Sequence, residues 1–253
     1  MDMSRFFVNE RDIGDSEIVI TDSGDLKHMR KVLRLKPGDE VEVSDSVKWE
    51  YRAVIEEISD DSAVLKITDK QAFSREPRIR VTLFQGVPKA SKMDEIVQKC
   101  TEEGVSEIYP VFMDRTVVVE KGGFGKKIDR WRKVAAEAVK QCRRGRIPEV
   151  GEQLSFGQMT DMLSDFDKVI FPYENETGRT IKDALRETVS CENGGCRPER
   201  MAVIIGPEGG FSDSEARALK ELGADCVSLG KTILRTETAG PAALAMIMYE
   251  LEL

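Results

Sequence analysis

The spacing of hydrophobic and polar positions changes once along the 253-residue chain. In the first part, apolar and polar residues alternate in short runs, which is typical of β-strands. This pattern predicts strands at 17–20, 40–43, 51–58 and 63–68, with a short helical segment at 25–35. Several short strands at close spacing, separated by turn residues, favour a small β-barrel.

From Arg78 onward, short apolar runs alternate with longer segments whose apolar residues recur at helical spacing. The expected strands are 79–84, 107–112, 168–171, 201–205 and 226–229, and the expected helices are one that starts after Ser91, 128–143, 180–188, 213–222 and one that ends at Leu251. This alternation predicts a parallel sheet with helices on both faces. The chain is therefore expected to be an α/β protein with two domains, 1–73 and 77–253.

Two of the expected helices begin with a serine that is followed three residues later by an acid. Ser91 with Asp94 matches the capping box, in which each of the two side chains binds the other residue's backbone N–H. Ser212 with Glu215 matches it as well. In the last helix, Pro241 is acceptable only within the first turn, where its missing N–H is not needed.

The amino-acid composition indicates where the protein acts and whether it binds a membrane or a metal. With 40% hydrophobic and 33% charged residues, the chain can bury a core and stay in solution. It has no run of about 18 apolar residues and no apolar segment of a signal peptide at its start, so no membrane partner is expected. Five cysteines, an odd number without a CxxC pair, and a single histidine predict a cytoplasmic location and no metal site.

The distribution of charge changes this picture, because a net charge of -8 taken alone argues against a nucleic-acid partner. Residues 27–36 hold five basic side chains and no acidic one, and residues 126–146 hold nine basic and two acidic ones. Contacts with RNA phosphates require such clusters. A solvated helix face is the alternative explanation for each cluster.

Two loops near the C-terminus carry the most specific pattern. Residues 204–212 read Ile-Ile-Gly-Pro-Glu-Gly-Gly-Phe-Ser, and residues 229–239 read Leu-Gly-Lys-Thr-Ile-Leu-Arg-Thr-Glu-Thr-Ala. Each follows an expected strand of a parallel sheet, where α/β proteins bind ligands, and glycine lets a ligand approach the backbone. Common alternatives fail, because 230–232 lacks the earlier glycine of a Walker loop and no G-x-G-x-x-G or G-x-S-x-G is present.

These loops resemble the signature of the RsmE family, which are small-subunit ribosomal RNA uridine-N3 methyltransferases of the SPOUT class. The resemblance extends over nearly the whole chain. Residues 4–7 and 28–35 are similar to the family's PUA-like N-terminal domain, 92–104 to its first strand–helix unit and 137–148 to its basic helix.

The resemblance implies a SPOUT α/β-knot methyltransferase domain with a C-terminal trefoil knot, preceded by a small PUA-like β-barrel that binds RNA. It also implies S-adenosylmethionine as methyl donor, N3 of a specific uridine in 16S ribosomal RNA or the small ribosomal subunit as acceptor, and a homodimer. It assigns binding of the methyl donor to Phe171, Pro172, Tyr173, Glu174, Ile205, Gly206, Glu208, Gly209, Gly210, Leu229, Gly230, Ile233, Leu234, Thr238 and Ala239. It assigns RNA binding to Arg5, His28, Arg30, Lys31, Arg34, Lys92, Arg143 and Arg144.

The implied reaction requires uracil N3, which carries a weakly acidic proton, to attack a sulfonium methyl group. A cation near O2 and O4 or a base for the proton would assist it. Arg235 is the candidate for the cation, since a guanidinium stays charged. Glu237 is the candidate base or positioning group, or else stabilises the N-terminus of the last helix. Thr236 and Thr238 either contact the substrate or cap that helix.

Several residues have a structural alternative. Phe171 and Ile205 could pack in the core at the strand ends, and His28 could serve either the fold or the RNA backbone. Arg144 could reach the active site or an RNA phosphate. Three aromatic residues could stack on an unpaired base, although packing in the barrel is favoured for each: Phe6, Trp49 and Tyr51. The glycine-rich stretch 121–127 is expected to be a loop, and 191–198 carries no assignable role.

Two other functions remain open at this point. One is a SPOUT enzyme that methylates another RNA position, such as a ribose 2′-oxygen, and the full-length resemblance argues against it. The other is an RNA-binding ribosome assembly factor without catalysis, and the intact glycines and the intact 235–238 segment argue against that.

Overall fold

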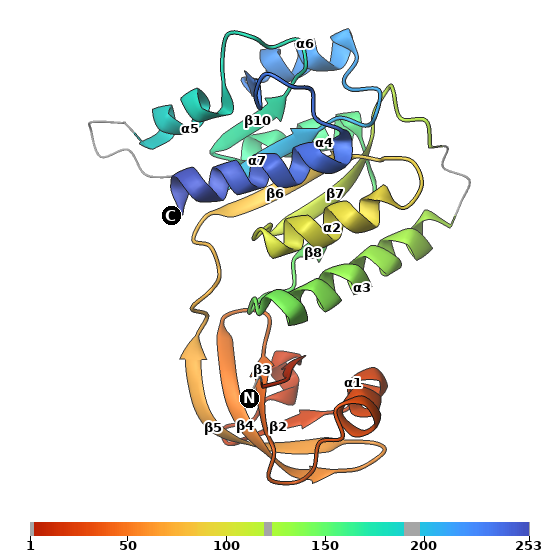
Figure 1. Cartoon of the computed structure of the whole chain (residues 1–253), viewed down its shortest axis with the longest axis vertical. Coiled ribbons are helices and arrows are strands. Elements are labelled where there is room, and N and C mark those ends of the chain that lie inside the picture. The colour runs from red at the N-terminus through yellow and green to blue at the C-terminus, as the bar shows by residue number, and fades with distance from the viewer. Residues whose placement is uncertain (1–2, 119–122, 190–197, 253) are drawn as a thin grey trace. The chain divides into compact units, whose positions relative to one another are not determined.

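The computed structural model describes residues 3–118, 123–189 and 198–252 (Figure 1). Its contacts divide the chain into two compact units. The N-terminal unit comprises the chain up to Glu76 together with Val139–Ile147, and the C-terminal unit comprises Pro77–Ala138 and the chain from Pro148 onward. In the part of the chain that the structure describes, no helix is both long and apolar enough to cross a membrane.

The N-terminal unit is built on a small curled sheet of five strands in the order β1-β3-β4-β5-β2. The strands are β1 (Arg5–Phe7), β2 (Glu17–Ile20), β3 (Glu40–Ser44), β4 (Trp49–Ile58) and β5 (Ala63–Ala72). The four predicted strands are confirmed, and β1, which pairs in parallel with β3, is an addition. Register shifts between β4 and β5 mark bulges, which increase the bend of the sheet.

The helical segment expected at 25–35 begins and ends earlier than predicted and has two parts. A helix, α1 (Ser23–Lys27), continues into a π-helical turn, η2 (His28–Val32), and a 3-10 turn, η1 (Glu10–Asp12), precedes both. The core lies on one face of the sheet and includes Phe6 and Tyr51, so packing, not base stacking, is the observed state of these two rings.

The C-terminal unit contains a sheet in which every pair of neighbouring strands is parallel, in the order β12-β10-β11-β6-β7-β8, with β9 also on β7. The strands are β6 (Arg80–Gly86), β7 (Glu107–Phe112), β8 (Glu149–Val150), β9 (Leu154–Ser155), β10 (Lys168–Pro172), β11 (Arg200–Ile205) and β12 (Asp225–Val227). The helices are α2 (Lys92–Glu102), α3 (Phe124–Cys142), α4 (Phe156–Met162), α5 (Ile181–Val189), α6 (Asp213–Glu221) and α7 (Thr236–Leu251), with a 3-10 turn η3 (Leu163–Asp165). The predicted parallel sheet is confirmed.

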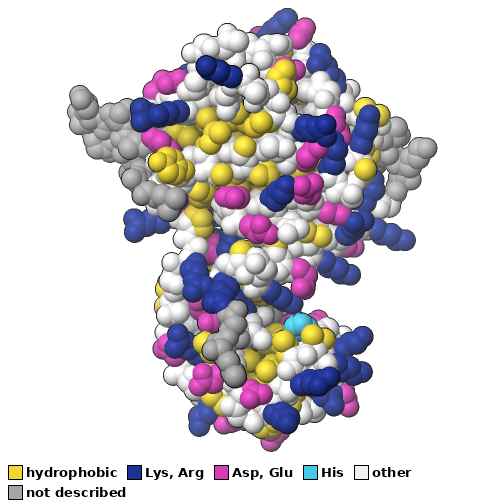
Figure 2. Space-filling view, viewed as in Figure 1, with side chains coloured by type: hydrophobic (Ala, Val, Ile, Leu, Met, Phe, Trp, Pro, Cys, Tyr) yellow, Lys and Arg dark blue, Asp and Glu magenta, His cyan; other side chains and the backbone are white. Residues whose placement is uncertain are grey.

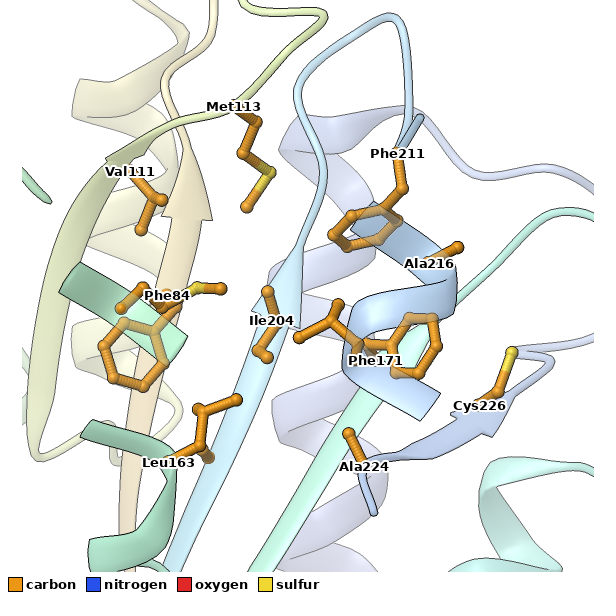
Figure 3. Close-up of a cluster of buried hydrophobic side chains, with 13 residues drawn as sticks. Phe84, Val111, Met113, Leu163, Phe171, Ile204, Phe211, Ala216, Ala224 and Cys226 are labelled. Atoms are coloured by element: carbon orange, nitrogen blue, oxygen red, sulfur yellow. The ribbon is translucent and has the colours of Figure 1, made fainter. Parts of the chain in front are cut away.

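Helices cover both faces of this sheet, as the alternation predicted (Figure 1). On one face, Phe84 of β6 and Ile204 of β11 pack with residues of α4, η3 and α6, including Leu163 and Ala216 (Figure 3). On the other face, α7 packs against α2, and Gly240 lies beside Leu83 of β6. The central strands are therefore apolar on both sides, as is typical of parallel sheets.

The capping predictions have different outcomes. Ser212 and Glu215 form the predicted capping box at the start of α6. At α2 the prediction is wrong, because the Ser91 side chain makes no cap hydrogen bond. The carboxylate of Asp94 instead pairs with Arg130 of α3, a partner distant in sequence.

Two further predictions need correction. The helix α7 begins at Thr236, so Pro241 lies beyond its first turn, where its ring removes the helical bond to the carbonyl of residue 237. The stretch expected to be a loop at 121–127 is helical from Phe124 onward, since α3 starts there. Residues 121–122 lie outside the described residues, as does 191–197.

Candidate active site

Three loops of the C-terminal unit meet at one edge of the sheet. They follow β10, β11 and β12, which are neighbours in the strand order. Because the three strands are parallel, their carboxyl ends lie at the same edge. This is the position at which open α/β sheets bind ligands.

These loops enclose a cavity of about 850 Å³. Its lining includes 13 residues expected to bind the methyl donor: Pro172, Tyr173, Glu174, Ile205, Gly206, Glu208, Gly209, Gly210, Leu229, Gly230, Ile233, Leu234 and Ala239. The lining also includes all three expected catalytic residues, Arg235, Thr236 and Glu237. Two expected residues lie elsewhere, because Phe171 is fully buried against Phe211 in the core and Thr238 is exposed outside the lining.

The loop after β11 is a tight turn whose glycines are in close contact with other parts of the chain. The N–H of Gly210 donates to the carbonyl of Pro207, and Gly210 has a φ of +67°, which favours glycine. The carbonyl of Gly209 accepts a hydrogen bond from the guanidinium of Arg115 at 2.9 Å. A side chain on Gly206 would meet the backbone of Gly210 at 3.1 Å. These contacts hold the loop in one shape.

The loop after β12 has a different character. Gly230 has a φ of +143°, and the hydroxyl of Ser228 accepts a hydrogen bond from its N–H and donates one to its carbonyl. From Lys231 to Leu234, no peptide group bonds to another group of the described residues. Peptide groups that line a cavity without protein partners can serve a ligand that is held by backbone hydrogen bonds.

Thr236 connects this loop to the two central strands. Its hydroxyl donates to the carbonyl of Gly206 at 2.7 Å and accepts from Nε2 of Gln85 at 2.9 Å, and both side chains are buried. The residue before α7 is Arg235, whose side chain makes no cap hydrogen bond, and Thr236 and Thr238 lie within the helix. The capping role suggested for Thr236 and Thr238 is therefore wrong, and Thr236 links β6, β11 and α7.

Replacing Thr236 with valine is expected to lower the free energy of unfolding by about 1–3 kcal/mol, because the Gln85 amide and the Gly206 carbonyl would lose a buried partner. Chemical denaturation would measure the change. The control is Thr160→Val in α4, whose hydroxyl lies at the surface and bonds only within its helix, with an expected change within about 0.5 kcal/mol. Equal effects of the two substitutions would contradict the role of Thr236.

A cluster of charges lies at the cavity wall. The ammonium of Lys92, the first residue of α2, is 3.1 Å from Oε1 of Glu208 and 3.1 Å from Oε2 of Glu237. Hydrogen bonds to Glu237 and Glu208 raise the pKa of Lys92. The hydrogen bond of Glu237 to its own backbone N–H, with Lys92 and Arg235, lowers the pKa of that carboxyl. Glu237 is thus a weak base, and the geometry favours a positioning role.

Glu208 is the second carboxylate of the cluster. Partial burial works against its ionisation, but hydrogen bonds from the N–H of Lys89 and from Lys92 outweigh the burial and lower the pKa of Glu208. Arg235 is less constrained, since its side chain is 83% exposed and its guanidinium lies 4.0 Å from Glu237. Among the cations of the described lining, Lys92 is therefore fixed by two carboxylates, whereas Arg235 extends into solvent.

Two residues expected to contact RNA are buried in the N-terminal unit. The guanidinium of Arg5 pairs with Glu42 at 2.9 Å and Glu50 at 3.2 Å, and donates to the backbone carbonyls of Arg143 and Arg144. The side chain of Arg144 pairs with Glu76 at 2.8 Å and is only 5% exposed. These contacts argue against RNA contacts by Arg5 and Arg144 and indicate that both residues stabilise the unit.

The remaining expected RNA-binding residues of this unit are accessible. His28, Arg30, Lys31 and Arg34 are exposed, and Arg143 is half-buried. The ring of His28 meets that of Phe6 edge-on at 6.5 Å, and Arg30 pairs with Asp60. Trp49, half-buried, lies beneath the ammonium groups of Lys48 and Lys70.

Sequence reasoning missed two residues that shape the site, Gln85 and Arg115. Gln85 lies near the end of the buried strand β6 and Arg115 follows β7, and neither position has a recognisable motif. The sequence also predicted that Lys92 contacts RNA, whereas the structure places Lys92 in the cavity lining beside two carboxylates. The partners of these residues are distant in sequence, which no local pattern reveals.

Two family models match the chain, the RNA methyltransferase domain over residues 74–248 and the RNA methyltransferase PUA domain over residues 20–68. A relative from Bacillus subtilis (strain 168), named ribosomal RNA small subunit methyltransferase E, is 31% identical and covers 99% of this chain and 98% of its own length. One of the same name from Synechocystis sp. is 29% identical and covers 98% of this chain and 78% of its own length.

Solved structures of methyltransferases are similar to this chain over nearly its whole length. Ribosomal RNA small subunit methyltransferase E from Neisseria gonorrhoeae, bound to S-adenosyl methionine, has a TM-score of 0.80 and 26% identity over 98% of both chains. A methyltransferase from Legionella pneumophila in complex with the cofactor SAM has a TM-score of 0.84 and 26% identity over 98% of both chains. The matched domains, the full-length relatives and the cavity lead to one conclusion. The chain belongs to the ribosomal RNA small subunit methyltransferase E family.

Proposed function

We propose that this protein transfers a methyl group from S-adenosylmethionine to N3 of a specific uridine in the 16S RNA of the small ribosomal subunit. The observation that carries the proposal is the cavity at the carboxyl ends of β10, β11 and β12, whose walls are the two loops that identify the family. S-adenosylmethionine supplies the methyl group when it is bound there.

The residues present fit this methyl donor. The cavity of about 850 Å³ is large enough for a drug-sized ligand. At Gly230 a Cβ would meet nothing within 4 Å, so a ligand can lie against the backbone there, and the peptide groups of 231–234 are available to hold it. Arg235 lies at the open side, where RNA would enter, and we assign it to the uracil. Lys231 and Thr232 add further polar groups to the lining.

We further propose that residues 1–73 form an RNA-binding PUA-like barrel and 77–253 the methyltransferase domain. The exposed basic side chains of the first domain, His28, Arg30, Lys31 and Arg34, support RNA binding, and Arg143 lies on the segment that packs with it. If these residues contact phosphates, RNA affinity falls steeply as salt rises.

A C-terminal trefoil knot is part of the proposal. The strand β12 is at the edge of the sheet, beside β10, whereas α7 packs on β6 and β11. The chain from 228 to 235 must therefore cross the ends of β10 and β11. Thr236 is then fixed to Gly206 by a hydrogen bond. This path is consistent with a threaded chain.

We also propose a homodimer that acts in the cytoplasm, where ribosomal subunits are assembled. The helix α7 is mostly apolar, and hydrophobic side chains are visible on the outer surface where it lies (Figure 2). Tyr249 on this helix is 70% exposed. An exposed apolar patch on a helix of this kind favours a protein–protein contact.

The proposed reaction predicts a specific product. The protein, labelled S-adenosylmethionine and small ribosomal subunits that lack the modification are expected to yield 3-methyluridine, identified by mass spectrometry of the RNA nucleosides. A 2′-O-methylated product would contradict the assignment to N3. Binding of the RNA without any product would favour an assembly factor that lacks catalysis.

A further inference from the structure

We propose that Lys92 is a catalytic residue of this reaction, whose ammonium group contacts a uracil carbonyl oxygen and stabilises the N3 anion. The inference rests on the proposed function and differs from the phosphate contact that the sequence led us to expect for this lysine. Lys92 would then act on the uracil ring and not on an RNA phosphate.

The geometry of Lys92 suits this role. Its Nζ lies 3.1 Å from a carboxylate oxygen of Glu208 and 3.1 Å from one of Glu237, and its side chain is 31% exposed. The two carboxylates hold the ammonium group as ion pairs from two sides. Lys92 also lines the cavity, so its ammonium group can donate to a ligand there.

The other cations of the described lining are less well fixed. The side chain of Arg235 is 83% exposed, and Lys231 is exposed as well. Stabilisation of a developing charge is most effective when the group is already in place, because no reorganisation is then required. Lys92 is held from two sides, by the loop after β11 and by the first turn of α7.

The carboxylates also define the chemistry that Lys92 can perform. They raise the pKa of Lys92 through hydrogen bonds, so it stays charged and cannot accept the N3 proton. The pKa of Glu237 is lowered, which makes it a weak base. Neither group is therefore suited to remove the proton, and the contribution of the cluster is to stabilise the anion after the proton has left.

The N3 proton of uracil passes to a water molecule at the open side of the cavity, and the resulting negative charge spreads onto O2 and O4. Lys92 stabilises that charge through its ammonium group. The N3–methyl bond then forms as the sulfur–methyl bond breaks, and the electron pair of the broken bond stays on the sulfur.

The test compares Lys92→Met with wild-type protein on two substrates, small ribosomal subunits containing uridine and subunits reconstituted with 5-fluorouridine RNA. Fluorine withdraws electrons and makes N3 more acidic, so an enzyme that lacks the cation should regain activity. We expect turnover of Lys92→Met to fall roughly 10²-fold on uridine. The deficit should be several-fold smaller on 5-fluorouridine, and the affinity for S-adenosylmethionine, measured by calorimetry, should be unchanged.

The control is Lys99→Met, the same substitution at an exposed position of the same helix, where the lysine pairs with Glu95. It should behave as wild type on both substrates. Lys92→Gln keeps hydrogen-bond donors for the two carboxylates but removes the charge, and should show the same substrate-dependent deficit. It replaces Lys92→Met if that variant does not fold.

Three results would overturn the inference. An equal deficit on both substrates, or a parallel loss of affinity for the methyl donor, would mean that Lys92 only supports the loops. Wild-type turnover in Lys92→Met would remove any role for the ammonium while leaving the proposed function intact. If wild-type protein makes no 3-methyluridine, the proposed function fails, and the role of Lys92 fails with it.

Discussion

Replacing Gly86 with alanine is expected to weaken binding of S-adenosylmethionine, although Gly86 does not line the cavity. A Cβ at this position would lie 2.5 Å from the nitrogen of Pro207 and 2.8 Å from the carbonyl carbon of Gly206. Both are backbone atoms, so no side-chain rotation relieves the overlap. The loop after β11, one wall of the cavity, must therefore move away from the end of β6.

Overlap of this kind costs about 1–3 kcal/mol in a packed interior. Since about 1.4 kcal/mol corresponds to a tenfold change in affinity, we expect binding to weaken about tenfold or more. Isothermal calorimetry measures the affinity, and thermal unfolding separates it from a general loss of stability. Gly157→Ala is the matched control, because a Cβ there meets nothing within 4 Å. Unchanged affinity in Gly86→Ala would show that the loop does not shape the binding site.

The glycines illustrate what the sequence can and cannot predict about the site. Their number and position after an expected strand are enough to predict a backbone-lined ligand site. The sequence does not reveal which glycines face the ligand. The structure separates them, because a Cβ on Gly209 would meet Arg115 at 2.9 Å, whereas one on Gly230 would meet nothing within 4 Å.

Local patterns predict the fold well where the interaction is itself local. The strand β7 has the predicted bounds, and the Ser212 capping box connects residues three positions apart. At α2 the same local pattern does not form a capping box, because the Asp94 carboxylate forms an ion pair with Arg130 of another helix. The two-residue strands β8 and β9 are too short to show any periodicity.

The basic residues also show that a local sequence pattern does not predict contacts between distant segments. A run of arginines and lysines indicates an RNA-binding face only if the side chains reach the surface. Arg5 forms ion pairs with Glu42 and Glu50, and Arg144 forms one with Glu76. Both arginines are buried and stabilise the N-terminal unit. Each of these ion pairs joins segments far apart in the sequence, so only the tertiary structure distinguishes them from phosphate contacts.

Replacing Arg235 with alanine is expected to lower turnover roughly 10²-fold while leaving the affinity for S-adenosylmethionine unchanged. Arg235 directly precedes α7 and lines the cavity, and among the described residues its guanidinium makes only a long contact of 4.0 Å with Glu237. It therefore contributes little to the structure of the free protein. Its charge becomes useful when the uracil arrives, because it can approach the anion that forms at N3 from the solvent side.

Single-turnover kinetics on undermodified small subunits and calorimetry with S-adenosylmethionine together test this assignment. Arg235→Lys keeps the charge but not the planar fork of donors, so it should recover part of the lost rate. Arg217→Ala is the control, since Arg217 is exposed on α6 and lies outside the cavity lining. If Arg235→Ala weakened the binding of S-adenosylmethionine as much as it slowed turnover, Arg235 would belong to the binding site of the methyl donor. A rate equal to wild type would leave Lys92 as the cation that acts on the uracil.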